Sequence, residues 1–475
     1  MTRSSFAVAL VAMACASSTA AIAQQAPWAK PDVPVTSHDR VYAAEQFSNT
    51  VSVVDPSTNT LLGVIKLGDP QPMNMSPLYK GQVLVHGMGF SPDGRTLAIV
   101  SIGSNAVSFI DTATNTVKHT TYVGRSPHEA FFTPDGSEVW VTVRGEDYVS
   151  VIDAKTFVEK DRVKTAGGPG MTIFSPDGRY AYVCSSFNPE VAVFETRSRK
   201  RAGTVTPPSP FCPNIAATPD GKQVWFTLKD VGRTVVFAAR PPFTVLKVID
   251  TGPITNHVNF AKTPKGLRAY VTIGGENKVR VFTTDTFEQT ATIPVGALPH
   301  GVWPSGDGSR IYVGLENADR LAAIDTATNT VIAEIPIGQA PQAIAYVPNA
   351  VTGAGTANLQ PLGVAGDTVR FTLNGVADTK VATSVTLFDQ GLTQIVQAAA
   401  VGLQPKRPYM LALADKADGS GALEPLARFM TNPAGGAIVN ATGPIRQIVK
   451  PTTAAQKRYL VIADEGGRVV QVQAQ

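Results

Sequence analysis

A short polar turn returns six times along this chain at nearly constant spacing. Each copy joins a Ser or Thr to a glycine three residues later, and the copies occupy residues 91–94, 133–136, 175–178, 218–221, 263–266 and 305–308. From glycine to glycine the steps are 42, 42, 43, 45 and 42 residues. This period corresponds to one four-stranded blade of a β-propeller and is too short for an independent domain. The spacing therefore predicts an all-β propeller before any single residue is interpreted.

Each turn is followed by two runs of β-branched and aromatic residues, a pattern typical of strands. Two of the links after the second run have the same sequence, Asp-Thr-Ala-Thr-Asn-Thr, at 111–116 and 325–330. On these repeats the chain resembles the YVTN-repeat family of seven-bladed β-propellers, over roughly residues 40 to 348. The resemblance implies a fold but not an activity, because one fold hosts many functions.

The strand count at the two ends of the repeats predicts how the ring closes. The strand pair that begins near Val41 lacks an inner strand, and the last inner strand, which contains Gln342, lacks its pair. Joining them gives seven blades and leaves only short protected edges. A second hairpin-like run at 458–472 leaves an alternative open, in which the C-terminus competes for closure or adds strands at an edge.

The N-terminal residues 1–23 have the pattern of a secretory signal peptide. Arg3 precedes an apolar run over 6–14, and Ala21-Ile22-Ala23 fits the small-x-small cleavage site. A lipoprotein anchored through Cys15 is the less favoured alternative. No later segment approaches the ~20 apolar residues of a membrane span, so we expect a periplasmic or secreted protein.

The remaining chain divides into four expected parts. They are an N-terminal extension at 24–39, the seven-bladed propeller at 40–350, a linker at 351–360 and a C-terminal β domain at 361–475. The 42-residue period stops after the linker, and short strand-like runs follow. An immunoglobulin-like or related small β-sandwich is the best guess for this domain. We expect it to pack against the propeller or bind a partner without lining the central channel.

Composition agrees with an exported all-β protein. Charged residues make up 16% of the chain and hydrophobic ones 43%, which excludes a disordered chain. The net charge of +4 is too small to indicate nucleic acid as a partner. After cleavage, Cys184 and Cys212 remain. An oxidising compartment allows them to pair if their Cα atoms lie within ~7 Å, and two buried free thiols are the alternative.

Four of the six histidines fall near one phase of the repeat, at the start of inner strands: His86, His128, His257 and His300. Three lie eight residues before the turn glycine, and His257 lies nine before it. Because inner strands line the central channel of a propeller, these side chains should converge at its mouth. His38 and His119 lie outside this phase, and we expect both at the surface.

Converging neutral imidazoles suit a transition metal such as copper or zinc. We therefore predict a metal site held by these four histidines, with Glu129 as a catalytic acid or base. Each ligand ring needs an acceptor for its other nitrogen, and Glu129 and Asn259 are the nearest in sequence. The chain also resembles exported propeller enzymes with axial histidines, nitrous oxide reductase and thiocyanate dehydrogenase. Both are copper enzymes with more histidines than this chain, so the resemblance implies one ion here.

Three classes of function remain open. The first is an exported metal-dependent oxidoreductase or lyase, and the second is a metal- or ligand-binding module without turnover. The third is a non-catalytic YVTN-repeat interaction scaffold that binds a protein partner through its loops, in which the histidines only line the channel. No Ser-His-Asp set, phosphate-binding loop or nicotinamide fingerprint is present. The repeated Asp93, Asp135, Asp177 and Asp220 are expected to be structural.

Overall fold

The structure is a computed structural model that describes residues 34–68, 83–363, 368–389, 394–451, 453 and 457–474. The predicted signal peptide at 1–23, including Cys15, lies outside the described residues. Among those that are described, no helix has the length and apolar character needed to cross a membrane.

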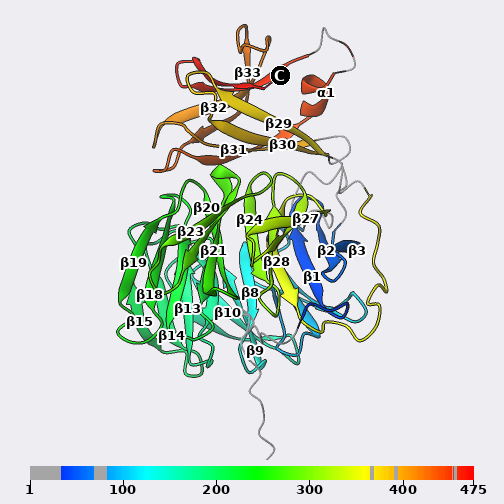
Figure 1. Cartoon of the computed structure of the whole chain (residues 1–475), viewed down its shortest axis with the longest axis vertical. Helices are drawn as coiled ribbons and strands as arrows, with labels where there is room; N and C mark the ends of the chain where they lie inside the picture. The colour runs from blue at the N-terminus through cyan, green and yellow to red at the C-terminus, as the bar shows by residue number, and fades with distance from the viewer. Residues whose placement is uncertain are drawn as a thin grey trace, which may run out of the picture.

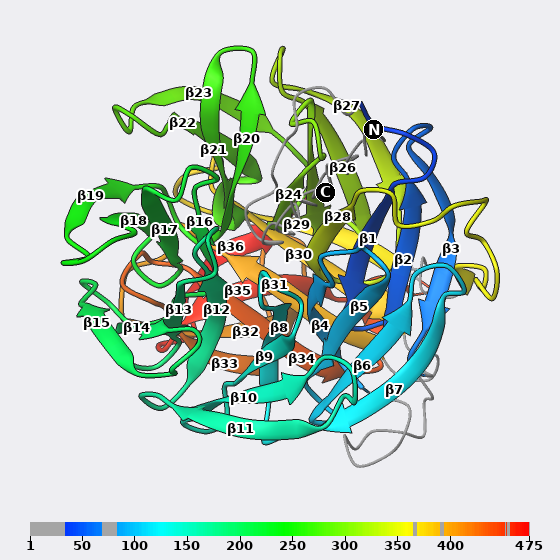
Figure 2. The ribbon, with the colours of Figure 1, turned by 90° about the horizontal axis from the view of Figure 1, so that it is seen from below.

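Seven four-stranded antiparallel sheets form a ring of blades in the described chain, seen along the ring axis in Figure 2. From the channel outward, blade 1 consists of β28 (Pro341–Val347), β1 (Arg40–Glu45), β2 (Thr50–Asp55) and β3 (Thr60–Lys66). Blade 2 consists of β4 (Val85–Phe90), β5 (Thr96–Ser101), β6 (Ala106–Asp111) and β7 (Thr116–Tyr122). Blade 3 consists of β8 (Pro127–Phe132), β9 (Glu138–Val143), β10 (Tyr148–Asp153) and β11 (Glu159–Lys164).

The other four blades follow in chain order. Blade 4 consists of β12 (Pro169–Phe174), β13 (Tyr180–Ser185), β14 (Val191–Glu195) and β15 (Arg201–Val205). Blade 5 consists of β16 (Ile215–Ala217), β17 (Gln223–Leu228), β18 (Arg233–Ala238) and β19 (Val245–Asp250). Blade 6 consists of β20 (Thr255–Thr263), β21 (Gly266–Ile273), the 3-10 turn η1 (Gly274–Glu276), β22 (Lys278–Thr283) and β23 (Gln289–Pro294). Blade 7 consists of β24 (Pro299–Pro304), β25 (Arg310–Leu315), β26 (Arg320–Asp325) and β27 (Thr330–Pro336).

The ring closes as the strand count predicts. Strand β1 pairs with β28, with Val41 opposite Tyr346 and Ala43 opposite Ile344. Blade 1 therefore contains strands from both ends of the repeats, and the seven-bladed propeller implied by the family resemblance is confirmed. The hairpin at 458–472 takes no part in closure, because its strands belong to the C-terminal sheet.

The recurring turn is structural, as expected. In the copy at 133–136, Asp135 accepts the Thr133 hydroxyl at 2.6 Å and the Ser137 N–H at 3.0 Å. Gly136 has φ +70°, a left-handed conformation that suits glycine. The same aspartate contacts are made by Asp93, Asp177 and Asp220.

Cys184 and Cys212 form a disulfide, with their Cα atoms 6.0 Å apart. Cys184 lies in β13 and Cys212 just before β16, so the bond joins blades 4 and 5 near the start of an inner strand. Of the two alternatives, the structure shows the paired one. Trp140 and Trp225 are fully buried in the cores between blades.

The C-terminal domain is one eight-stranded antiparallel sheet rather than two stacked ones. Its order is β33 (Leu423–Met430), β32 (Pro408–Ala414), β35 (Tyr459–Asp464), β36 (Val469–Gln473), β29 (Thr368–Gly375), β30 (Ala382–Asp389), β31 (Gln394–Ala400) and β34 (Ala437–Gly443). A short helix, α1 (Ile445–Val449), follows β34. The sheet curls until its edge strands β33 and β34 approach each other, which encloses its own apolar core. The all-β class is confirmed.

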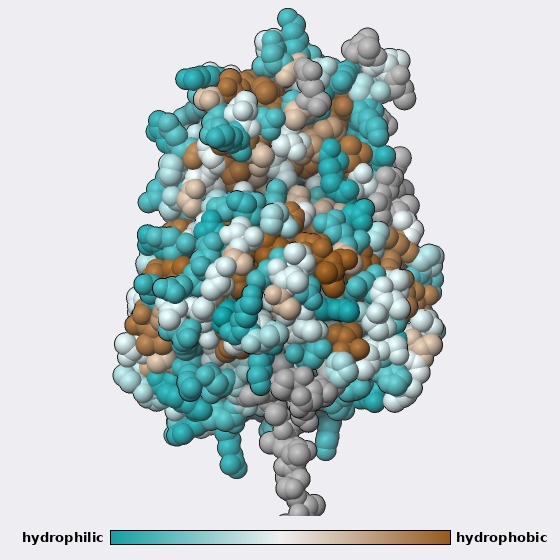
Figure 3. All heavy atoms as spheres, viewed as in Figure 1, coloured by the Kyte–Doolittle hydropathy of each residue, from teal (hydrophilic) through white to brown (hydrophobic). Residues whose placement is uncertain are grey.

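This domain lies over one end of the propeller (Figure 1). The Gln397 side chain donates to Oε1 of Glu316 at 2.9 Å, and the Thr386 hydroxyl donates to the Asn317 carbonyl at 2.7 Å. An apolar cluster also crosses the junction, with Ile254 of the propeller against Val401 of the domain. The molecular face in Figure 3 is mainly hydrophilic, with hydrophobic residues in scattered groups, as is usual for a folded protein.

The ring closure contains a buried carboxyl group, and this leads to a pH prediction. Glu45 is fully buried, and burial raises its pKa from 4.5 to about 7 although Thr50, Ser52 and Gly338 donate to it. The unfolded chain therefore loses this proton at lower pH than the folded chain, so the free energy of unfolding should fall as pH rises from 4.5 to about 7. Replacing Glu45 with Gln should remove up to about 3 kcal/mol of that fall.

The measurement is the melting temperature of the wild type and Glu45→Gln at several pH values between 5 and 8. Any hydrogen-bond cost of the amide is constant with pH, so the change in the difference between the two proteins isolates the ionisation of Glu45. A difference that stays constant across this range would contradict the prediction.

Candidate metal centre

A break in strand register places the site residues at the start of the inner strands. In β8, Pro127 and Ala130 pair with β9, while His128 and Glu129 between them do not. The same break recurs in β4 around His86 and Gly87 and in β24 around His300 and Gly301. Such bulges redirect side chains and are common beside functional sites. Here they aim residues of separate blades at the channel mouth.

His257 does not share the position of the other three histidines, which corrects the prediction of a common phase. In β20 the unpaired residues are Asn256 and His257. His257 therefore corresponds to Glu129 of blade 3, and Asn256 corresponds to His128. The hydrogen bonds agree, because the backbone N–H groups of His257 and Glu129 both bond to a threonine hydroxyl of the next strand, at 2.8 and 3.1 Å. The spacing to the turn glycine did not reveal this shift, because Glu129 lies seven residues before its glycine, while the longer β20–β21 hairpin places His257 nine before Gly266.

The four imidazoles form two neighbouring pairs. Ring centroids of His86 and His128 lie 4.4 Å apart, and those of His257 and His300 lie 4.6 Å apart. The pairs approach each other at His86 and His300, 6.4 Å apart. All four histidine residues are at most 7% exposed, so they cluster inside the protein as predicted.

Three groups come close enough to hold one metal ion: His86, His128 and Glu129, whose ligand atoms all lie within 4.8 Å of one another. Nδ1 of His86 lies 3.9 Å from Oε1 of Glu129, and neither buried atom has a hydrogen-bond partner in the described chain. Buried polar atoms normally have partners. The group could therefore hold an ion, with two imidazole nitrogens and one carboxylate oxygen as ligands.

Backbone carbonyls, rather than Glu129 or Asn259, orient two of the rings. Nδ1 of His128 bonds to the Gly170 carbonyl at 2.8 Å, and Nδ1 of His300 bonds to the Gln342 carbonyl at 2.7 Å. Because each Nδ1 donates, Nε2 keeps its lone pair for a ligand. Asn259 instead donates to the Val302 carbonyl, so the expectation that Glu129 and Asn259 accept the N–H groups of these rings is wrong.

Gly87 makes room for the acidic ligand. A Cβ atom at this position would lie 2.1 Å from the His128 carbonyl oxygen and 2.4 Å from Oε2 of Glu129. The carboxylate therefore packs directly on the backbone of the neighbouring inner strand. Only glycine leaves this approach open.

Burial keeps the imidazoles neutral and favours a protonated Glu129. Burial lowers the pKa of His86 and His128 well below the usual value, and Arg144 adds to the effect on both. Burial likewise lowers the pKa of His300 to about 3, helped by Lys229. Burial raises the pKa of Glu129 to about 8. A cation bound at the three ligands would offset this cost by favouring the carboxylate.

A cavity of about 420 Å³ lies between the channel mouth and the C-terminal domain. We call it the interdomain cavity. Its lining includes His86, Arg144, Lys229 and Glu316 from the propeller, with Gln397 from the C-terminal domain. The expectation that this domain does not line the channel is therefore wrong at the mouth. The domain encloses the site because its sheet packs across the ends of the inner strands.

The other two histidines lie at the surface, as expected. His38 and His119 are exposed. Glu129 and His257 also line a smaller space, together with Trp303. Arg144, Lys229 and Glu316 were not predicted from the sequence. Each lies eight residues after a turn glycine and directly follows the second strand of its blade, but this repeat position holds a different residue type in each blade.

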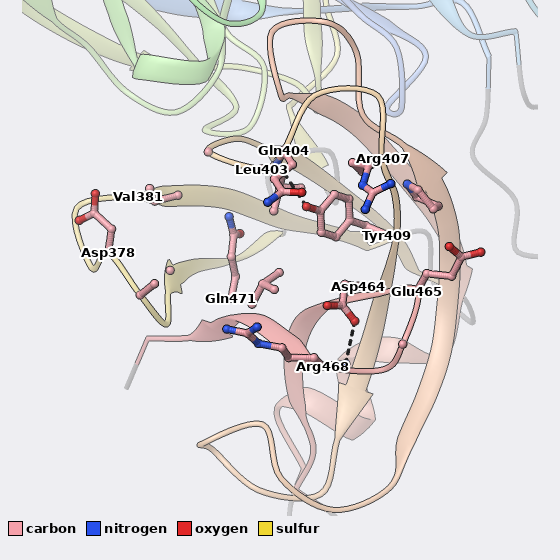
Figure 4. A pocket seen from close by; sticks show the side chains of 16 residues that line it. Asp378, Val381, Leu403, Gln404, Arg407, Tyr409, Asp464, Glu465, Arg468 and Gln471 are labelled. Carbon is pink, nitrogen blue, oxygen red and sulfur yellow. Dashed lines mark hydrogen bonds between the residues drawn. The ribbon is translucent and has the colours of Figure 1, made fainter.

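A second pocket, of about 540 Å³, lies within the C-terminal domain (Figure 4). Asp464 and Arg407 are among its lining residues. Asp464 accepts the backbone N–H of Arg468 at 2.9 Å, and the Tyr409 hydroxyl accepts the Gln404 N–H at 3.2 Å. These groups are engaged in shaping the loops, and the pocket contains no histidine or cysteine.

Comparison with known proteins agrees with the fold. A family model described as Lactonase, 7-bladed beta-propeller, matches residues 108–223. No curated protein matches the chain. A functionally unknown protein from Desulfotomaculum acetoxidans has a TM-score of 0.54 and 14% identity, over 65% of this chain and 98% of that one.

Two further solved structures have lower TM-scores. Kuenenia stuttgartiensis hydrazine synthase has a TM-score of 0.48 and 22% identity, over 55% of this chain and 88% of that one. Dihydro-heme d1 dehydrogenase NirN in complex with DHE has a TM-score of 0.48 and 11% identity, over 89% of this chain and 80% of that one. At these identities the likeness concerns the fold alone. The fold and the site together define a seven-bladed β-propeller with a buried cluster of histidines and one glutamate at its channel mouth.

Proposed function

We propose that this is an exported metal-dependent enzyme, an oxidoreductase or lyase, with one zinc or copper ion held by His86, His128 and Glu129. The observation that carries the proposal is the trio of buried ligand atoms within 4.8 Å of one another. Two imidazoles and one carboxylate form a set that zinc enzymes use, with a further position left for water or substrate. Copper also accepts imidazole ligands.

The surroundings support turnover rather than storage of the ion. The trio adjoins the interdomain cavity through His86, and that cavity has room for a small molecule beside the metal. A bound zinc or copper ion would act as a Lewis acid, and copper would also act as an electron acceptor. In this proposal Glu129 is the third ligand rather than a free acid or base, since its carboxylate faces His86.

The second histidine pair has a supporting role in the proposal. His257 and His300 lie next to the trio without joining it. Nε2 of His257 is buried without a hydrogen-bond partner in the described chain. We propose that this pair contacts a ligand of the metal from the opposite side of the channel.

Export is part of the proposal and rests on the sequence pattern of residues 1–23 together with the disulfide between Cys184 and Cys212. Disulfides persist mainly in oxidising compartments. The alternative function, a non-catalytic interaction scaffold, leaves the unpartnered buried atoms of the trio without a role.

Elemental analysis tests the proposal. Protein purified from the periplasm without chelators should contain close to one equivalent of zinc or copper per chain. After removal of the metal with EDTA, titration with each ion should restore the same stoichiometry with submicromolar affinity. Protein that takes up neither ion at micromolar concentration would contradict the proposal and favour the alternative, a non-catalytic interaction scaffold.

A further inference from the structure

We propose that the interdomain cavity binds a small organic carboxylate through Arg144 and Lys229, so that the substrate of the metal site is an anion. The inference rests on the proposed function for the position of the metal, but its two cationic residues lie outside the ligand trio. Both line the cavity that also contains His86.

Arg144 is fixed by aromatic rings instead of by an acid. Its guanidinium carbon lies 5.7 Å from the centroid of Phe187 and 5.4 Å from that of Phe211. Such stacking holds the orientation of a guanidinium and leaves its N–H donors free for a planar anion. Within the described chain, this side chain makes no ion pair or hydrogen bond. The two rings therefore hold Arg144 so that its guanidinium can donate two hydrogen bonds to an anion in the cavity.

Lys229 is the second free cation in the cavity. It follows β17, and its backbone N–H bonds to the Phe211 carbonyl at 3.3 Å, so its position is tied to the ring that supports Arg144. Its ammonium group makes no ion pair or hydrogen bond within the part of the chain described. Burial lowers its pKa, and Glu316 and Asp230 offset this only in part. An anion in the cavity would stabilise the charged form of Lys229.

The rest of the lining indicates an organic anion rather than a bare inorganic one. Amide groups are supplied by Gln342 and Asn440, while Phe211, Ile254 and Ile438 supply apolar surface. The volume of about 420 Å³ lies within the range of small-molecule sites, ~300 to 1,000 Å³. A carboxylate at Arg144 and Lys229 would leave room for a carbon skeleton against this apolar wall.

A metal ion in the trio strengthens the argument. The ion would add positive charge beside a cavity whose lining contains Arg144 and Lys229 together with the acids Asp230 and Glu316. The two acids balance the two cations, so the added ion would leave the cavity positively charged and would be repelled by Arg144 and Lys229. A bound carboxylate relieves this repulsion. The same arrangement places a substrate's charged end on the cations and its reacting end toward the ion.

The test measures carboxylate binding separately from metal binding. Calorimetric titrations of metal-free and zinc-loaded protein would use acetate, malonate, succinate and inorganic phosphate as probes. The variants are Arg144→Gln and Lys229→Gln. Matched controls are Arg125→Gln and Lys222→Gln, whose side chains are 77% and 79% exposed on the same two blades. Melting temperatures check that all four variants remain folded.

We expect at least one carboxylate to bind the metal-free protein, with affinity reduced at least tenfold in each cavity variant and unchanged in both controls. Metal stoichiometry should stay near one in Lys229→Gln, since this residue is no ligand. Absence of carboxylate binding to both metal forms, or binding that is equal in all variants, would overturn the inference. Phosphate binding that exceeds carboxylate binding and depends on both cations would overturn the carboxylate class.

The two proposals fail separately. Carboxylate binding that depends on Arg144 and Lys229 in a protein that takes up no metal would leave this inference standing and reject the metal-dependent enzyme. A protein that binds metal but no carboxylate would reject this inference and leave the metal-dependent enzyme standing.

Discussion

His128→Ala should lose its bound zinc or copper and keep its fold. The substitution removes one of the three proposed ligands. The affinity for the ion should fall by more than about 100-fold, since even mutation of a residue that hydrogen-bonds to a metal ligand lowers metal affinity about 10 to 100-fold. The fold should survive because the Gly170 carbonyl, which accepts from His128, also accepts the Thr142 hydroxyl at 2.9 Å. Metal titration together with a thermal melt measures both effects.

His119→Ala is the matched control for this prediction. His119 is exposed on β7, an outer strand of blade 2, so its loss should change neither metal content nor affinity. Equal metal binding by His128→Ala and the wild type would show that His128 is not a ligand. A loss of affinity in His119→Ala of the same size would show that the assay reports surface binding.

Gly87→Ala should be the most damaging change of a single methyl group in the channel. The added Cβ would meet the His128 carbonyl oxygen at 2.1 Å, and this backbone atom cannot turn away. Overpacking of this kind costs about 1 to 3 kcal/mol of unfolding free energy. The carboxylate of Glu129 would also be displaced from His86, so metal affinity should fall together with stability.

Gly353→Ala controls for the substitution itself, because no atom lies within 4 Å of a Cβ at that position. Urea unfolding curves of the two variants, with and without zinc, separate the effects. Gly353→Ala should match the wild type. A Gly87→Ala protein with wild-type stability and wild-type zinc affinity would mean that Glu129 does not pack against β4 as the structure shows.

The propeller could be predicted because its information is local and repeated. Five of the six turns fix a hairpin through one aspartate, as Asp135 does, and the spacing of the turns gives the blade length. Closure followed from counting strands, since β1 and β28 each lacked a partner. The C-terminal sheet could not be predicted in this way. Its order depends on distant pairings, such as Leu373 with Gln473, that no local pattern encodes.

The candidate site was predictable only in part, for a similar reason. The repeat phase brought the histidines to one end of the channel, and all are buried there. The bulges then decided which ones meet, and His257 falls one position away from the others. Arg144 and Lys229 escaped detection because their role depends on a cavity formed by two domains. Such a cavity is a property of packing between distant segments.

Anomalous X-ray scattering from crystals of the metal-loaded protein, recorded at the zinc and copper absorption edges, tests the central claim most directly. We predict one anomalous peak, which marks an ion about 2.0 to 2.2 Å from a nitrogen of His86, Nε2 of His128 and an oxygen of Glu129. Nε2 of His128 keeps a lone pair for the ion because Nδ1 of the same ring donates to the Gly170 carbonyl. A peak located only at His257 and His300, or no peak in the channel, would contradict the assignment of the metal site.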